Sequence, residues 1–278
     1  IADVQPFWIG HPYGIALAHN GNLFNYEELK QELLAKHRHL NSSSDSEVLL
    51  HLLADGLDDG DVAKTEEKFF EKLCHGVGEV FKQAKGAYSV VSMVIGKGLI
   101  AFRDPHGIRP LVMGERNNGE GTDYAFASEP TMFYSLDYEL TGNVEPGELI
   151  FIASSGKIYR KQINVKTFTP CIFEYVYFSR PDAKLDEVSV YRARLRMGQN
   201  LAKKWQEKHP NAQPDIVIPA PFTANTAALS FAHEIGVRYS EGLYKNPFVG
   251  RTFIMPNHAE RKRAIRYKLS PQETEIRD

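Results

Sequence analysis

This sequence of 278 residues has few cysteines, a small net charge and only short apolar runs. Its two cysteines, Cys74 and Cys171, are too few for a disulfide framework and lack the spacing of metal ligands. The expected compartment is therefore the reducing cytoplasm. A net charge of −2 gives no global attraction to nucleic acid or to an anionic membrane, and the apolar runs are too short to span a bilayer. We therefore expect partners that are small molecules.

The hydrophobic content of 42% is enough for one large domain or two ordinary ones. In the first half, helical patterns alternate with strand patterns, an order that favours helices packed on antiparallel sheets. The spacing predicts helices over 26–34, 48–57 and 66–83, a hairpin of strands 87–95 and 99–102, and a polar surface loop over 116–123.

The segment His19-Asn20-Gly21-Asn22 follows a strand-like run over 13–18. An Asn side-chain amide and a Gly backbone N–H in one loop are the donor pair that stabilises an oxyanion during acyl transfer. Asn-Gly is also a strong signal for a tight turn. The dipeptide Asn20-Gly21 by itself is therefore compatible with a catalytic loop and with a simple turn.

A second polar segment predicts the start of a helix. Ser44 is the expected N-cap, and Glu47 follows at capping-box spacing, which places Asp45 in the first helical turn. An acidic side chain at that position can complement the helix dipole or bind a ligand. Both roles remain open for Asp45 from the local sequence.

Taken together, the segments around Asn20 and Asp45 resemble the glutamine-binding half of class II glutamine amidotransferases. The resemblance continues through further segments and narrows to the amidophosphoribosyltransferase family; these segments are 102–111, 126–129, 173–182, 189–198 and 245–254. It implies an α+β and α/β protein. An N-terminal-nucleophile-hydrolase-like αββα glutaminase domain over 1–165 would precede a Rossmann-like type I phosphoribosyltransferase domain over 166–278, both truncated.

The resemblance implies glutamine-dependent transfer of ammonia to phosphoribosyl pyrophosphate, which gives 5-phosphoribosylamine, glutamate and pyrophosphate. This is the first committed step of de novo purine biosynthesis. Asn20 and Gly21 would stabilise the oxyanion, and Asp45 would hold the α-ammonium of glutamine. The family also implies Mg²⁺, purine nucleotides as feedback inhibitors and a homo-oligomer, with no nucleic acid or membrane partner.

In the second half, Ser189 is the expected cap of a helix that runs to about Lys208. A buried strand over 215–219 and a helix over 225–235 follow, an order suited to a parallel sheet. Thr223 lies where strand leads into helix. Such a position suits contact with a phosphate or a metal-bound hydroxyl, and equally a plain N-cap.

The resemblance assigns phosphoribosyl pyrophosphate contacts to Tyr177, Thr223, Lys245 and Arg251, and places Thr223 near the metal. The basic segment 251–268 is then a lid over this substrate, although a solvated charged face fits its composition too. Cys171 could be an iron–sulfur ligand, as in some family members, but this chain does not supply a ligand set. Phe222 stands where the family usually has an acidic residue.

The family's nucleophile is an N-terminal Cys, whereas this sequence opens with Ile1 and closes at Asp278 before the expected phosphate loop. We therefore expect an internal fragment without glutaminase activity of its own. Two alternatives stay open. One is another class II amidotransferase, such as a glucosamine-phosphate or asparagine synthetase. The other is a degenerate, non-catalytic nucleotide-binding or regulatory protein.

Overall fold

The computed structural model describes residues 3–250 and 257–277. The chain divides into two compact units, Ile1–Cys171 and Ile172–Asp278. This division falls six residues after the boundary predicted from the sequence at 165/166.

The last residues of the first unit are held by the body of that unit. The backbone N–H groups of Lys166, Thr169 and Cys171 donate to the carbonyls of Pro105, His106 and Ile108, respectively. These hydrogen bonds explain why the segment after residue 165 remains part of the first unit.

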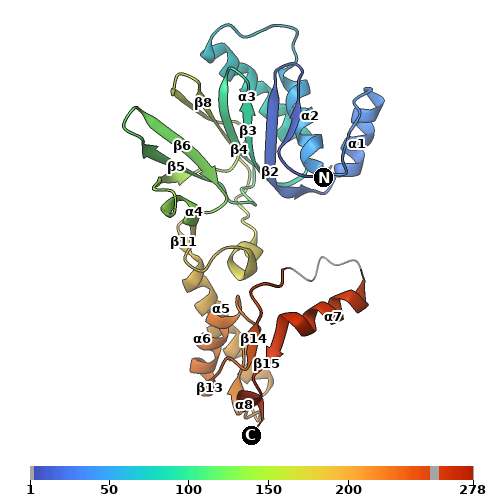
Figure 1. The fold of residues 1–278 in the computed structure, drawn as a ribbon. Coiled ribbons are helices and arrows are strands. Elements are labelled where there is room, and N and C mark those ends of the chain that lie inside the picture. Colours follow the sequence, from blue (N-terminus) through green and yellow to red (C-terminus); the bar gives the residue numbers. More distant parts are fainter. Residues whose placement is uncertain (1–2, 251–256, 278) are drawn as a thin grey trace. The chain divides into compact units, whose positions relative to one another are not determined.

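A six-stranded sheet forms the centre of the first unit, and every neighbouring pair in it is antiparallel (Figure 1). In spatial order its strands are β1 (Phe7–Ile9), β2 (Ile15–Leu23), β3 (Gly86–Val94), β4 (Gly98–Arg103), β8 (Glu148–Ala153) and β9 (Ile158–Gln162). The pairing of β3 with β4 confirms the predicted hairpin.

The larger core of this unit lies between one face of the sheet and three helices. These helices are α1 (Tyr26–Ala35), α2 (Asp45–Leu57) and α3 (Glu66–Gln83), which confirms the three predicted helices. Because side chains alternate along a strand, Ile15, Leu17, His19 and Leu23 of β2 share the face toward the helices, and all four are buried. His19 is the polar member of this series.

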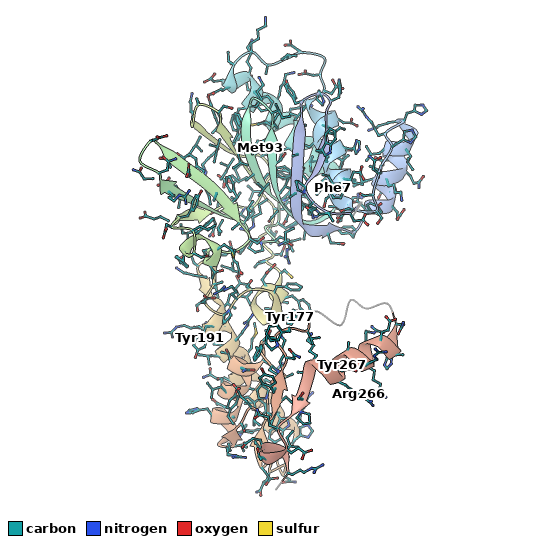
Figure 2. The ribbon with its side chains drawn as sticks, in the orientation of Figure 1. Phe7, Met93, Tyr177, Tyr191, Arg266 and Tyr267 are labelled. Atoms are coloured by element: carbon teal, nitrogen blue, oxygen red, sulfur yellow. The ribbon has the colours of Figure 1, made fainter. Side chains whose placement is uncertain are left out.

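The opposite face of the sheet packs in part against a second, three-stranded sheet. In that sheet β5 (Val112–Asn117) lies between β6 (Thr122–Ala127) and β7 (Glu139–Asn143), and the short helix α4 (Thr131–Tyr134) joins β6 to β7. Ala101 and Ile150 of the large sheet form a second core with Leu111, Met113 and Val144. Beyond this cover, Met93 on β3 remains 59% exposed (Figure 2).

The predicted surface loop over 116–123 is wrong over half of its length, because β5 and β6 extend into it and leave only the turn 118–121. The turn is tight because the Asn118 side-chain oxygen accepts hydrogen bonds from the backbone N–H groups of Glu120 and Gly121.

Two long helices, α5 (Val190–Lys208) and α6 (Asn225–Ile235), dominate the second unit. Both follow the prediction: the Ser189 hydroxyl accepts from the N–H of Arg192, and Gly236 ends α6 with a left-handed φ of 71°. The remaining elements are a π-helical turn (Glu174–Phe178), β10 (Lys184–Leu185), β11 (Val188–Ser189), β12 (Ile216–Val217), β13 (Arg238–Tyr239), β14 (Leu243–Lys245), α7 (His258–Lys268), β15 (Leu269–Pro271) and α8 (Glu273–Ile276).

The strand β12 pairs in parallel with β13, and α6 connects them. The predicted buried strand over 215–219 is therefore too long, since only Ile216 and Val217 pair and both are half-buried. Within the described residues β13 is the one strand that pairs with β12. The length of β12 is therefore limited to the residues that pair with β13. No helix in the described ranges combines the length and apolarity that a bilayer crossing needs.

Candidate functional site

Asn20 and Gly21 lie inside strand β2, opposite Ser89 and Tyr88 of β3. The two interpretations of the dipeptide, a catalytic loop and a tight turn, are therefore both wrong about its backbone, which is a strand. The close approach of the two strands explains the glycine: a Cβ at Gly21 would lie 1.9 Å from the carbonyl oxygen of Ala87.

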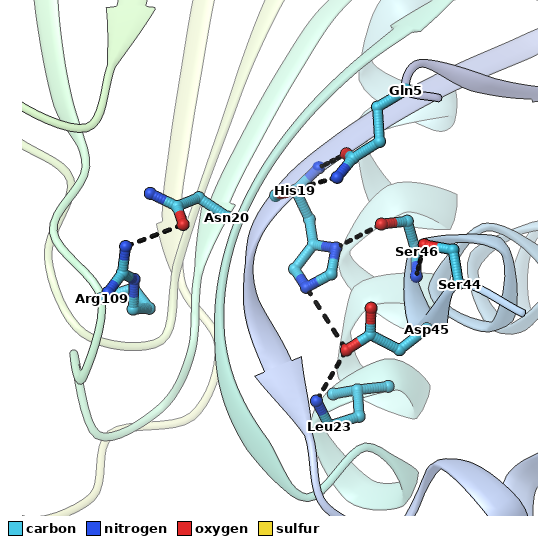
Figure 3. A network of polar contacts seen from close by, with 8 residues as sticks. All are labelled: Gln5, His19, Asn20, Leu23, Ser44, Asp45, Ser46 and Arg109. Atoms are coloured by element: carbon cyan, nitrogen blue, oxygen red, sulfur yellow. Dashed lines mark hydrogen bonds and ion pairs between the residues drawn. The ribbon is translucent and has the colours of Figure 1, made fainter. Parts of the chain in front are cut away.

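The alternation along β2 sends Asn20 and His19 to opposite sides of the strand (Figure 3). The Asn20 side chain is exposed but held at both ends. Arg109 donates to its Oδ1 at 2.7 Å, and its Nδ2 donates to the Ser128 hydroxyl at 3.0 Å. Within residues 3–250 and 257–277 no protein group accepts the second N–H of this amide. The amide thus has a fixed orientation and one donor available for a ligand.

Two buried charges shape the loop that presents Arg109. The Arg103 guanidinium donates to the carbonyls of Arg109, Val144 and Gly107 at 2.6, 3.1 and 2.9 Å. The Asp104 carboxylate accepts from the N–H groups of His106, Ile108 and Arg109 at 2.9, 2.9 and 3.3 Å. Burial raises the pKa of Asp104, while these hydrogen bonds and Arg103 act against the rise.

The start of α2 is partly as predicted. The Ser44 hydroxyl accepts from the N–H of Ser46 at 3.3 Å, which confirms the N-cap, and Asp45 begins the helix. The capping box is wrong, because the Glu47 carboxylate accepts instead from the N–H groups of Asn41 and Ser42 at 2.9 and 2.8 Å. Burial favours a higher pKa for Glu47, but these hydrogen bonds outweigh it and lower the pKa.

Asp45 ties the start of α2 to the end of β2. Its Oδ2 accepts from the backbone N–H of Leu23 at 2.8 Å and lies 3.8 Å from Nε2 of His19. No residue in the described ranges donates a hydrogen bond to Oδ1, and the Asp45 side chain is 20% exposed. Asp45 therefore offers a carboxylate oxygen to a cation, on the His19 side of the strand that carries Asn20 (Figure 3).

His19, beside Asp45, is a buried polar residue with several hydrogen-bond partners. Its Nδ1 lies 2.7 Å from the Ser46 hydroxyl, and the Gln5 side chain hydrogen-bonds its backbone N–H and carbonyl. Burial lowers the pKa of His19, Asp45 opposes this effect, and Arg109 lowers the pKa further. The imidazole is therefore mostly neutral at pH 7. No local pattern in the sequence signals this role, since the partners come from distant segments.

In the second unit, Lys245 and the Thr223 turn lie close together. The Lys245 ammonium is 5.0 Å from the centre of the Phe222 ring, next to Thr223. The plain N-cap interpretation of Thr223 is wrong, because Ala224 occupies the N-cap of α6 and no side chain caps it. Arg251 lies outside the described residues, as does the segment 251–256 of the predicted lid.

Tyr177 belongs to the π-helical turn of the second unit and is 42% exposed (Figure 2). The buried Arg194 side chain shapes this turn by donating to the carbonyls of Tyr175 and Ser179, both at 2.7 Å. The remainder of the basic segment forms α7, none of whose side chains is buried.

A metal site fits poorly with the described residues. Among them no three His, Cys, Asp or Glu side chains gather in a group that could hold an ion. Thr223 contributes one hydroxyl, and Phe222 contributes no ligand atom. The described residues alone therefore supply no complete ligand set for a metal ion or an iron–sulfur cluster.

Residues 1–135 match the family model of a glutamine amidotransferase domain. The matched range includes strand β2 with Asn20 and the start of α2 with Asp45. The chain is also 45% identical to the amidophosphoribosyltransferase of Pseudomonas aeruginosa and 43% identical to that of Pasteurella multocida, with 99% and 100% of the chain aligned. It is a homologue of the amidophosphoribosyltransferases along its whole length.

The chain spans about half the length of these curated relatives, namely 55% of each. A solved structure gives the same picture. The glutamine phosphoribosylpyrophosphate amidotransferase of B. subtilis, complexed with ADP and GMP, matches 98% of the chain with a TM-score of 0.76 and 33% identity, over 55% of its own length.

The close fit at Gly21 predicts a loss of stability when a methyl group is added. Gly21→Ala should lower the free energy of unfolding by about 2 kcal/mol or more, because the Cβ collides with a backbone carbonyl that cannot move without breaking strand pairing. Urea unfolding would measure this, with Gly121→Ala as control, since no atom lies within 4 Å of a Cβ there. Equal stability of both variants would contradict the close approach of β2 to β3 at this position.

The lowered pKa of His19 predicts a pH-dependent stability. Since the folded state binds fewer protons than the unfolded state, stability should be full above the ordinary pKa of about 6.5 and should fall as pH drops through it. Burial also lowers the pKa of His51, which adds a loss of the same sign. His19→Gln should therefore keep only part of the slope between about pH 7.5 and 5.5. Urea unfolding at several pH values would test this, and an unchanged slope would exclude His19 as its source.

Proposed function

We propose that the first unit carries the glutamine-hydrolysing half of an amidophosphoribosyltransferase. In the whole protein, glutamine would be hydrolysed to glutamate, and the ammonia would displace pyrophosphate from phosphoribosyl pyrophosphate to give 5-phosphoribosylamine. The observation that carries the proposal is the Asn20 amide, which Arg109 and Ser128 hold with one N–H available. Homology over the whole chain supports it.

Attack on the glutamine amide places negative charge on its carbonyl oxygen. A donor that is already fixed in place stabilises that charge without reorganisation when the reaction occurs. In this proposal the second N–H of Asn20 is such a donor, and the Gly21 N–H is its neighbour. The positive charge of Arg109, one hydrogen bond away, favours the same oxyanion.

Asp45 is the proposed anchor for the α-ammonium of glutamine. Its Oδ2 is held by the Leu23 N–H, so the carboxylate keeps one orientation while Oδ1 faces partly exposed space. The helix dipole also stabilises a negative charge in the first turn of α2. Asp45 is thus attached to β2 at Leu23, which lies three residues along the strand from the oxyanion donor Asn20.

The helices α1, α2 and α3 on one sheet face and the second sheet on the other support three of the four layers of an αββα, N-terminal-nucleophile-hydrolase-like glutaminase domain; in the described residues only the short α4 accompanies the second sheet. The parallel β12–α6–β13 unit supports a Rossmann-like phosphoribosyltransferase domain in the second unit. We propose that Thr223, Lys245, Arg251 and Tyr177 contact phosphoribosyl pyrophosphate there; the nearness of Lys245 to the Thr223 turn supports the first two.

We propose purine nucleotides as regulators, because the B. subtilis relative is complexed with ADP and GMP. Relatives named amidophosphoribosyltransferase match the chain from end to end, which favours this function over another class II amidotransferase or a non-catalytic protein.

The two half-reactions should respond differently to loss of Asn20. In the full-length protein that contains this chain, Asn20→Gly should lower glutamine-dependent synthesis by about 10²–10³, the usual cost of one oxyanion donor. Synthesis from added ammonia should stay near the parent level, since no amide oxyanion forms. Asp45→Asn should act mainly through KM for glutamine, because the ammonium contact exists in ground and transition states alike.

Steady-state rates with glutamine and with ammonium chloride would measure both effects. Equal loss of the two activities in Asn20→Gly, with the fold intact by circular dichroism, would place Asn20 in structure instead of catalysis.

A further inference from the structure

We propose that Arg109 is a positioning residue for glutamine hydrolysis, which acts by orienting and polarising the Asn20 amide. The inference rests on the proposed function, because it assigns the oxyanion to Asn20. Arg109 itself does not need to touch the substrate: its guanidinium donates to Oδ1 of Asn20 at 2.7 Å, and the catalytic donor is the Nδ2 of that amide.

The orientation of an Asn amide needs a partner that can tell oxygen from nitrogen. The two ends have nearly the same shape, and a flipped amide would turn its oxygen, a repulsive group, toward the oxyanion. The Ser128 hydroxyl at the Nδ2 end can donate or accept, so it tolerates both orientations. A guanidinium has only donors and tolerates only Oδ1. Arg109 is therefore the partner that selects the productive orientation.

The charge of Arg109 adds a second effect. A guanidinium remains protonated at all ordinary pH values, and a charge-assisted hydrogen bond is stronger than a neutral one. Such a bond to Oδ1 draws electron density from the amide and makes its N–H a better donor, because linked hydrogen bonds polarise one another. Oxyanion stabilisation by Asn20 should therefore exceed that of an isolated amide.

The backbone of Arg109 is anchored from both sides. Asp104 accepts from its N–H, while Arg103 and the Ser89 hydroxyl, at 2.6 and 3.1 Å, donate to its carbonyl. Ser89 is also the residue paired with Asn20 across β2 and β3. The same pair of strands thus fixes both ends of the contact between Arg109 and Asn20, which explains how the half-buried Arg109 side chain can be held in a reproducible position.

Kinetics of Arg109 variants in the full-length protein test the proposal. Arg109→Gln should lower kcat for glutamine hydrolysis about 10- to 100-fold, less than the 10²–10³ for removal of a donor, with KM for glutamine little changed. Arg109→Lys should recover part of the loss, since an ammonium also only donates. Ammonia-dependent synthesis should not change. Arg116→Gln is the matched control, because Arg116 pairs with Asp123 on the second sheet.

A double-mutant cycle separates positioning from a general structural effect. If Arg109 acts through Asn20, then Arg109→Gln should have little further effect in an Asn20→Gly background. Full additivity of the two substitutions, or equal loss of glutamine- and ammonia-dependent activity in Arg109→Gln, would overturn the proposal.

A second readout does not depend on activity. In ¹⁵N spectra of the chain itself, the two Asn20 Nδ2 protons should give separate, sharp signals that broaden in Arg109→Gln and persist in Arg109→Lys and Arg116→Gln. Unchanged Asn20 signals in Arg109→Gln would overturn the inference even in an active enzyme. Absence of glutamine hydrolysis in the parent protein would instead refute the proposed function, and the spectra would still decide whether Arg109 holds Asn20.

Discussion

The pairing of β2 with β3 is the interaction on which the candidate site depends. It runs from Ile15 opposite Val94 to Leu23 opposite Gly86, and it decides which side chains of β2 face the helices. A slip of one residue would exchange the two faces. Gly21 opposes such a slip, since the space beside the Ala87 carbonyl admits no Cβ and a slip would bring Asn20 or Asn22 there. The strand register thus places His19 against the core and Asn20 on the other face.

Two networks meet along this strand. On the helix side, His19, Ser46 and Asp45 join β2 to the start of α2. The buried His19 imidazole stands in a row whose other buried side chains are leucine or isoleucine. On the other side, the loop with Arg103 and Asp104 delivers Arg109 to Asn20. Burial of the Arg103 and Asp104 charges is costly, and six hydrogen bonds to backbone groups outside the strands offset the cost. These hydrogen bonds fix the loop that positions the half-buried Arg109 side chain.

The sequence predicts those parts that depend on local signals. Apolar periodicity and end signals locate α3 and α6 to the residue, and the Ser44 cap correctly places Asp45 at the start of α2. Local signals fail where a partner outside the expected motif competes. The turn propensity of Asn20-Gly21 loses to β3, more than sixty residues away in sequence, and Glu47 leaves its capping role because Asn41 and Ser42 offer it several donors. The link between Arg109 and Asn20 spans 89 residues, so no local pattern could reveal it.

In the proposed function, the exposed side of β2 binds the side-chain carbonyl of glutamine. The most direct measurement is a crystal structure of the full-length protein with glutamate, the product of hydrolysis, bound to it. We expect a side-chain carboxylate oxygen about 3 Å from Nδ2 of Asn20, the distance of a hydrogen bond, and the α-ammonium beside Asp45. Glutamate bound away from β2, or an Asn20 amide that turns its oxygen toward the ligand, would contradict it.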